Sequence, residues 1–206
     1  MVETDLDLRA ANAELAALSA ADRIRWASER FGSGLLLTTS FGTYSAVMLH
    51  LTKTVAPEAP IVSIDLGHTE GVDGFAQTLK ERLDLQVHEY VVPPPAERKR
   101  EGESDEDSLR REKVETLERA LAEHGTKVWM SGVQKGETAE REAFDFLMRR
   151  EDGLLKLHPV LDWTSKELFE YCKQHNLPMN FGYFDPLKGE DQNKECGIHL
   201  TGLKKS

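Results

Sequence analysis

Short apolar segments that alternate with amphipathic stretches constrain the fold of this chain more than any other feature. Five segments are brief, apolar and bounded by Gly or polar residues, which is typical of buried strands. They are Gly34–Thr39, Ile61–Asp65, Gln86–Val92, Lys127–Ser131 and Leu154–His158. Apolar residues at helical spacing predict helices over Thr4–Leu18, Ala21–Arg30, Ser45–Thr54, Asp73–Leu83, Ser108–Glu123 and Thr164–His175. This alternation predicts an α/β fold, with a mostly parallel sheet and helices on both faces.

Helix-end signals and changes in composition divide the chain into three parts. Ser19 is a predicted helix cap, and Thr164 with Glu167 forms a capping-box pattern. We expect N-terminal helices over residues 1–33, an α/β domain over 34–175, and a tail over 176–206 that lacks periodicity. Residues 93–108 are almost wholly Pro, Gly, Ser and charged residues, so we expect an exposed, mobile loop there.

Three polar, glycine-containing loops follow strands of the predicted sheet. They are Thr38–Ser45, Asp65–Thr69 and Gly132–Arg141. In open α/β sheets, ligands bind beyond the carboxyl ends of the strands. We therefore expect these loops, although far apart in the sequence, to converge on one binding site.

The first loop joins a strand to the N-terminus of a helix. Its hydroxyls, backbone amides and the positive helix end together suit an anion. The residues concerned are Thr39, Ser40, Phe41 and Gly42. The loop lacks the Gly-Lys-Ser/Thr ending of a P-loop, and an ordinary turn between a strand and a helix would use the same residue types.

The other two loops carry charged side chains. Asp65 with Gly67 suits hydrogen bonds to a nucleotide base or ribose, or equally a turn that caps the next helix. In the third loop, phosphate or sulfate would suit a planar guanidinium fork and a lysine point charge. The residues there are Lys135, Thr138 and Arg141, interspersed with Glu137, Glu140 and Glu142. These glutamates leave open a solvated loop held by salt bridges.

One of the two cysteines has a setting unusual for a packing residue. Cys196 stands in Lys194-Glu195-Cys196-Gly197-Ile198-His199, within a polar segment, whereas a buried thiol usually lies in an apolar run. The cationic neighbours Lys194 and His199 favour a reactive thiolate on a mobile arm. The alternative is a terminal cysteine that is merely exposed. Cys172 lies beside Tyr171 in a predicted helix, and we expect it to pack in the core.

Composition argues against several classes of partner. The formal net charge of −10 disfavours broad binding to nucleic acid or to an anionic membrane surface. No N-terminal signal pattern or long apolar run appears, so we expect a cytoplasmic protein. Two cysteines make no disulfide framework and cannot alone hold an iron–sulfur cluster. Five histidines, beyond His158 and His199, show no metal-ligand spacing, and we expect no metal site.

Several of these motifs, in this order, resemble the phosphoadenylyl-sulfate (PAPS) reductase family. The resemblance extends from about Gly34 to His199, and the terminal Glu-Cys-Gly-Ile-His is its most specific element. The matching segments are Thr39–Gly42, Asp65-x-Gly67, Lys113–Glu115 through Arg119–Leu121, Gly132–Arg141, His158–Thr164 and Glu195–His199.

The resemblance implies an adenine-nucleotide α-hydrolase-like domain that binds a sulfonucleotide across its strand ends. It implies that Cys196 attacks the sulfur, giving an enzyme S-sulfocysteine and adenosine 3′,5′-bisphosphate, and that thioredoxin or glutaredoxin then frees sulfite. Thr39, Ser40, Phe41 and Gly42 would belong to the phosphate-binding loop, and Asp65 and Gly67 to the nucleotide-binding turn. Lys135, Thr138 and Arg141 would grip phosphate or sulfate, and Lys194 and His199 would hold the closed tail. A homodimer is compatible with this reading, and no bound cofactor is expected.

The chain departs from the family pattern at three places. The family usually has Arg-Arg at Gln134-Lys135 and Asp-Thr-Gly at Asp65-Leu66-Gly67, and the segment between Pro178 and Glu195 is short. The extra cysteines of the adenylyl-sulfate reductase branch are missing, which favours the cluster-free PAPS branch. Three alternatives remain: a cluster-free adenylyl-sulfate reductase, an ATP pyrophosphatase-type enzyme, and an inactive nucleotide-binding or interaction protein.

Overall fold

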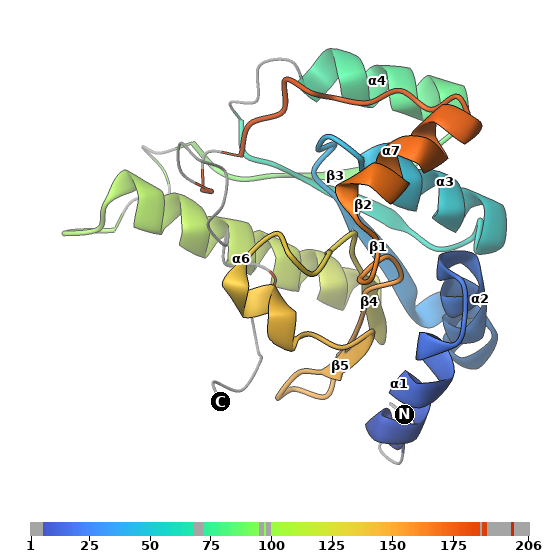
Figure 1. The fold of residues 1–206 in the computed structure, drawn as a ribbon. Helices are drawn as coiled ribbons and strands as arrows, with labels where there is room; N and C mark the ends of the chain where they lie inside the picture. Colours follow the sequence, from blue (N-terminus) through green and yellow to red (C-terminus); the bar gives the residue numbers. More distant parts are fainter. Residues whose placement is uncertain are drawn as a thin grey trace.

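A six-stranded sheet forms the centre of the part of the chain that the computed structural model describes, namely residues 6–67, 72–94, 97, 100–185, 187–188 and 199. Figure 1 shows its arrangement. The strands are β1 (Leu35–Thr39), β2 (Ile61–Asp65), β3 (Val87–Val91), β4 (Val128–Met130), β5 (Leu147–Arg149) and β6 (Leu155–Leu157). Their order is β3-β2-β1-β4-β6-β5, and every neighbouring pair is parallel except β5 with β6. The predicted fold class is confirmed.

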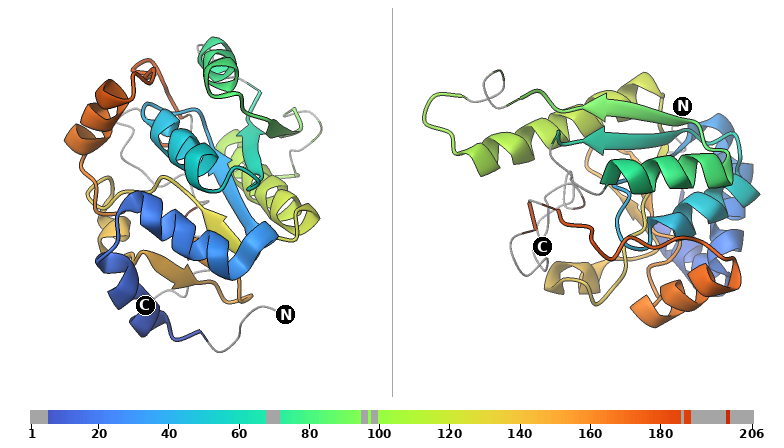
Figure 2. Two further views of the ribbon diagram at one scale, coloured as in Figure 1. Left: turned by 90° about the vertical axis from the view of Figure 1, so that its right-hand side faces the viewer. Right: turned by 90° about the horizontal axis from the view of Figure 1, so that it is seen from above.

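Helices cover both faces of the sheet. They are α1 (Leu8–Ala16), α2 (Ala20–Phe31), α3 (Ser45–Val55), α4 (Val72–Leu83), α6 (Asp105–Glu123) and α7 (Ser165–Gln174), with short 3-10 turns at Gly32–Gly34 and Ala139–Ala143. Leu37 and Met130 point from the sheet into one apolar cluster with α1, α2, α3, α4 and α7. Leu36 and Trp129 point the other way, into a second cluster with α6. Figure 2 shows α6 on the opposite side of the sheet from α3.

Side-chain caps explain why the predicted starts of some helices agree with the structure. Ser19 accepts a hydrogen bond from the Asp22 amide at 3.1 Å, as predicted for the start of α2. The capping box of α7 is also present, with Thr164 and Glu167 bonded to each other's backbone amides. The first helix begins later than predicted, because Asp7 provides its cap.

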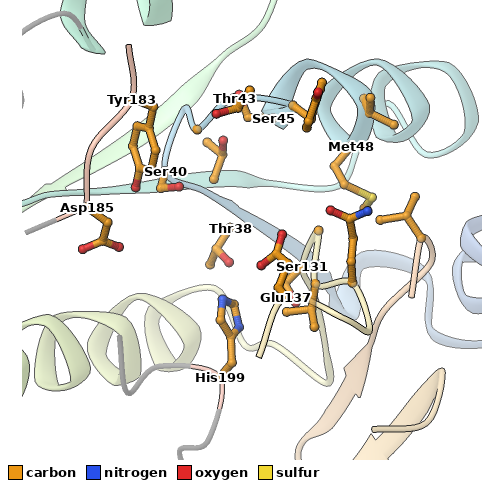
Figure 3. Close-up of a pocket in the computed structure, with 18 of the residues that line it drawn as sticks. Thr38, Ser40, Thr43, Ser45, Met48, Ser131, Glu137, Tyr183, Asp185 and His199 are labelled. Carbon is orange, nitrogen blue, oxygen red and sulfur yellow. The ribbon is translucent and has the colours of Figure 1, made fainter. Parts of the chain in front are cut away.

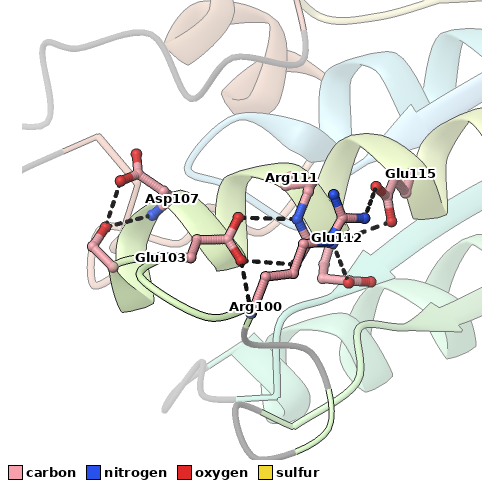
Figure 4. A network of polar contacts seen from close by, with 7 residues as sticks. Arg100, Glu103, Asp107, Arg111, Glu112 and Glu115 are labelled. Atoms are coloured by element: carbon pink, nitrogen blue, oxygen red, sulfur yellow. Dashed lines mark hydrogen bonds and ion pairs between the residues drawn. The ribbon is translucent and has the colours of Figure 1, made fainter.

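Helix α6 begins at Asp105, so the last residues of the segment 93–108, which was predicted to be a loop, are helical. Ser104 caps the helix by accepting from the Asp107 amide at 3.0 Å, and acidic residues fill the first turn, where the helix dipole favours them. Arg111 donates two 3.0 Å hydrogen bonds to Glu103 (Figure 4). These bonds lower the pKa of Glu103 to about 2. The charged residues of this segment therefore stabilise the first turn of α6.

Strand β5 is the element that the sequence pattern missed. It pairs with β6 in antiparallel register, with Leu147 opposite Leu157. Asn12 on α1 closes the outer edge of β5, because its side-chain amide donates to the Leu147 carbonyl and accepts from the Leu147 amide, both at 2.8 Å. The helices of residues 1–33 thus pack against the sheet, and the division into three segments stays a prediction.

Cys172 is fully buried, as predicted, and burial raises the pKa of its thiol to about 11. In the described part of the chain, no helix has the length and apolar character needed to cross a membrane.

Candidate functional site

The loops that follow β1 and β4 meet at a cavity of about 250 Å³ at the carboxyl edge of the sheet. Its walls include Thr39, Ser40 and Gly42 from the first loop, and Gln134 and Arg141 from the second. A smaller hollow beside it is lined by Ser40 and by Asp65, which ends β2. The loops after β1 and β4 converge on one cavity as predicted, and the turn after β2 borders the adjoining hollow. Figure 3 shows side chains from the loops after β1 and β4 around the cavity.

The loop after β1 presents hydroxyls and a tight backbone to the cavity. Phe41 has a left-handed backbone conformation, with φ 51°, and its ring is buried in the core and borders the smaller hollow. This strained conformation orients Ser40 and Gly42 towards the cavity. A Cβ atom at Gly42 would lie 3.4 Å from the Tyr183 ring and 3.5 Å from Ser40 Oγ, which are ordinary contact distances, so Tyr183 packs directly over this loop.

The turn after β2 is organised by its own aspartate. Asp65 Oδ1 accepts a 2.7 Å hydrogen bond from the Gly67 amide, and Gly67 has φ 78°, which suits glycine. Asp65 is exposed and lines the smaller hollow. The same carboxylate therefore shapes the turn and stands at the rim of the smaller hollow.

The three predicted anion-binding residues of the loop after β4 differ in exposure and in whether they line the cavity. Arg141 is 2% exposed, lines the cavity and forms an ion pair with Glu137. Thr138 is buried next to it without lining the cavity. The Lys135 side chain is exposed and also lies outside the cavity lining. Of the three residues, the structure brings Arg141 alone into the cavity wall.

His199, near the end of the tail, lies in the cavity wall. Its ring stacks on Trp129 with centroids 5.9 Å apart, and its carbonyl accepts a hydrogen bond from the Lys156 ammonium. In Figure 3 the imidazole points into the cavity from the side opposite Ser40 and Thr43. Burial, and then the charge of Arg141, lowers the pKa of His199 well below its usual value. Cys196 and Lys194 lie outside the described residues, and their predicted roles stay predictions.

Sequence reasoning missed a buried ion pair in the cavity wall. Lys113 on α6 lies 3.2 Å from Asp185, and their side chains are 7% and 4% exposed. Asp185 also accepts from the Leu187 amide at 2.9 Å. Tyr183 completes this wall next to Gly42. Lys113 belongs to the quoted resemblance, but its position in a helix gave no signal of a site, because the pair is formed across 72 residues.

His158 has a structural setting behind the cavity wall. It is fully buried, stacks on Phe144 and lies with Nδ1 3.0 Å from Ser131 Oγ. Burial, followed by the charges of Lys156 and Arg141, lowers its pKa well below the usual value. A neutral imidazole at this position supports the Ser131 hydroxyl in the cavity wall. The described residues contain no cluster of three or more His, Cys, Asp or Glu that suits a metal ion.

Comparison with known proteins identifies the family. Residues 34–185 match the family model described as the phosphoadenosine phosphosulfate reductase domain. The chain belongs to this family. The phosphoadenosine 5′-phosphosulfate reductase of a Synechococcus species is 38% identical over 92% of this chain and 95% of its own length. The enzyme of the same name from a Synechocystis species is 33% identical over 96% and 92%.

Solved structures of other proteins share the fold. A phosphoadenylyl-sulfate reductase from Candida auris, solved as a phosphate complex, has a TM-score of 0.66 at 20% identity and covers 88% of this chain and 95% of its own. An NH3-dependent NAD synthetase from Campylobacter jejuni has a TM-score of 0.59 at 15% identity, covering 97% and 80%. The resemblance inferred from the sequence is confirmed, and the chain is an enzyme of the phosphoadenosine phosphosulfate reductase type.

Proposed function

We propose that this chain reduces 3′-phosphoadenylyl sulfate to sulfite and adenosine 3′,5′-bisphosphate in assimilatory sulfate reduction, with Cys196 as the nucleophile. The observation that carries the proposal is the position of His199 in the cavity wall. Three residues of extended chain span at most about 11 Å, so covalent geometry keeps Cys196 within that distance of His199. A thiol so tethered is within reach of a nucleotide bound in the cavity.

The proposed chemistry transfers a sulfo group to Cys196 and releases it as sulfite, in three steps. The Cys196 thiolate attacks the sulfur, the bond from sulfur to the nucleotide phosphate oxygen breaks, and its electron pair leaves with adenosine 3′,5′-bisphosphate. A thiolate of thioredoxin or glutaredoxin then attacks Cys196 Sγ and expels sulfite. The second thiol of that protein resolves the mixed disulfide, which returns the Cys196 thiol and leaves the partner oxidised.

Other residues would bind and orient the substrate. Arg141, supported by Thr138 and Lys135, would hold phosphate or sulfate through charge-assisted hydrogen bonds. Thr39, Ser40, Phe41 and Gly42 would form the phosphate loop, and Asp65 with Gly67 the nucleotide turn. Lys194 and His199 would secure the closed tail. The proposal includes a cytoplasmic location, no iron–sulfur cluster and no other bound cofactor, and a homodimer is compatible with it.

One observation favours adenylyl sulfate as a second candidate substrate. Gln134, where the family usually has arginine, is 4% exposed and donates a 2.6 Å hydrogen bond to the Trp163 carbonyl. Because Gln134 is uncharged and its amide is bonded to the Trp163 carbonyl, the site has fewer cationic side chains with which to bind the additional 3′-phosphate. Rates of sulfite formation from the two nucleotides, measured side by side, decide between them.

The nucleophile is tested by trapping its adduct. We expect wild-type protein mixed with 3′-phosphoadenylyl sulfate, without a reductant, to gain one SO3 unit on the peptide that contains Cys196. Cys196→Ser should lose both the adduct and sulfite formation in the presence of thioredoxin. Cys172→Ala is the matched control, because Cys172 is buried in the core, and it should keep both. An unmodified Cys196 peptide, or equal turnover by Cys196→Ser, would reject the proposal.

A further inference from the structure

Glu137 is a carboxylate in the wall of a cavity that is proposed to receive an anion. Its Oε2 atom forms the ion pair with Arg141 and lies 3.9 Å from the ammonium of Lys188. Both cations also line the cavity. One carboxylate oxygen thus lies between two positive groups, where an oxygen of a bound phosphate or sulfate would make the same contacts.

The second carboxylate of the cavity has a different environment. Both oxygens of Asp185 are engaged, one by Lys113 and the other by the Leu187 amide, and its side chain is 4% exposed. The Glu137 side chain is 37% exposed, and Glu137 lies in the loop just before the 3-10 turn Ala139–Ala143. Asp185 is therefore a fixed part of the wall, whereas Glu137 can rotate into solvent.

We propose that Glu137 is a resident counter-ion of Arg141 in this cavity and that an incoming oxyanion displaces it. The inference rests on the proposed function for the identity of the natural anion. The Arg141 side chain is 3% exposed, and a buried guanidinium without a counter-ion is costly. Glu137 stabilises the empty cavity, so its displacement subtracts from the affinity for any anion that takes its place. It thereby sets how readily an anionic product leaves.

Inorganic pyrophosphate, titrated calorimetrically, tests this role without requiring turnover. Glu137→Gln keeps the size of the side chain and removes its charge, so we expect pyrophosphate to bind about two- to fivefold more tightly, the range expected for a partly exposed ion pair. Glu140→Gln is the matched control, because Glu140 lies on the same segment with an exposed side chain outside the cavity lining. Its affinity should equal that of the wild type.

The possible outcomes separate this inference from the proposed function. Tighter binding by Glu137→Gln alone supports displacement, and a lower KM for the nucleotide should accompany it. Unchanged or weaker pyrophosphate binding by Glu137→Gln, no binding by either protein, or an equal gain in Glu140→Gln would overturn it. Sulfite formation by the wild type is scored independently, so an inactive protein with the expected pyrophosphate result contradicts the proposed function and leaves the role of Glu137 intact.

Discussion

At the scale of single residues, the buried ammonium of Lys156 calls for an explanation. Lys156 is 0% exposed in β6, lies 4.6 Å from the centre of the Trp129 ring and donates to the carbonyl of His199. A buried charge is costly unless its partners compensate for it, so the contact with the tail is the most direct reason for a lysine here. We infer that Lys156 positions the tail that carries Cys196.

Replacing this lysine should separate positioning from binding. In Lys156→Met, we expect sulfite turnover to fall roughly ten- to hundredfold, the cost of a misplaced reacting group, while affinity for adenosine 3′,5′-bisphosphate changes little. Thermal unfolding should be unchanged or shifted upwards, because methionine suits the apolar surroundings. Lys166→Met, on the exposed face of α7, is the control. Normal turnover, or an equal loss of nucleotide affinity, would refute a positioning role.

At the scale of elements, α7 depends on its first turn. Its capping box joins the Thr164 amide to Glu167 at 2.7 Å and the Glu167 amide to the Thr164 hydroxyl at 3.3 Å. The hydrogen bonds that the Thr164 amide and then the Thr164 hydroxyl donate to the Glu167 carboxylate lower the pKa of Glu167. The helix brings Leu168 to the cavity wall and buries Cys172 in the core. The cap therefore contributes both to stability and to the position of one wall of the site.

Removing the cap should destabilise the protein measurably. We expect Thr164→Ala to lower the free energy of unfolding by about 0.5–2 kcal/mol, the usual cost of losing a side-chain cap. For a chain of this length, each kcal/mol corresponds to a fall in Tm of about 2–4 °C. Differential scanning calorimetry measures the change, with the exposed neighbour Ser165→Ala as the control. An unchanged Tm in Thr164→Ala would show that the capping bonds contribute nothing.

Elements whose signals are local could be predicted from the sequence, and those that depend on distant partners could not. The Ile61–Asp65 strand was predicted with its observed bounds, and Thr164 was recognised as a cap, because apolar runs and capping boxes lie within a few residues. Strand β5 has only three residues and depends on pairing with β6 and on Asn12. The burial of Lys156 arises from packing on Trp129, which no local pattern reports.

The candidate site divides in the same way. Loops at strand ends could be assembled from topology alone, since parallel strands align their carboxyl ends, and Arg141 was found by its chemistry. The exposure of Lys135 depends on the path of the chain after α6, and the pairing of Lys113 with Asp185 depends on its path after α7. Residue types within a few positions do not predict either path.

At the scale of the whole molecule, four histidines in separate elements share a lowered pKa. Burial is the main cause for His50, His124, His158 and His199. A histidine whose folded pKa lies below its unfolded value binds fewer protons in the folded state, so stability rises with pH through that interval and falls on acidification. Carboxylates such as Glu103 also lose stabilising charge in acid, but at lower pH.

Acidification from pH 7.5 to 5.5 should therefore destabilise the protein. Urea unfolding at the two pH values is expected to give a smaller free energy of unfolding at pH 5.5. His50→Gln should reduce this difference, because His50 contributes through burial between Tyr171 and His175, and glutamine does not titrate. Equal stability at both pH values, or a greater stability at pH 5.5, would contradict the direction expected from the four histidines.

The amide clamp between Asn12 and β5 has a practical consequence for anyone who shortens this chain. A sheet whose last strand shows bare peptide groups invites neighbouring molecules to add strands of their own. Here one small side chain, supplied from more than a hundred residues away, occupies those groups at Leu147. Trimming the amino-terminal helix would uncover that border and expose it to strand addition and aggregation.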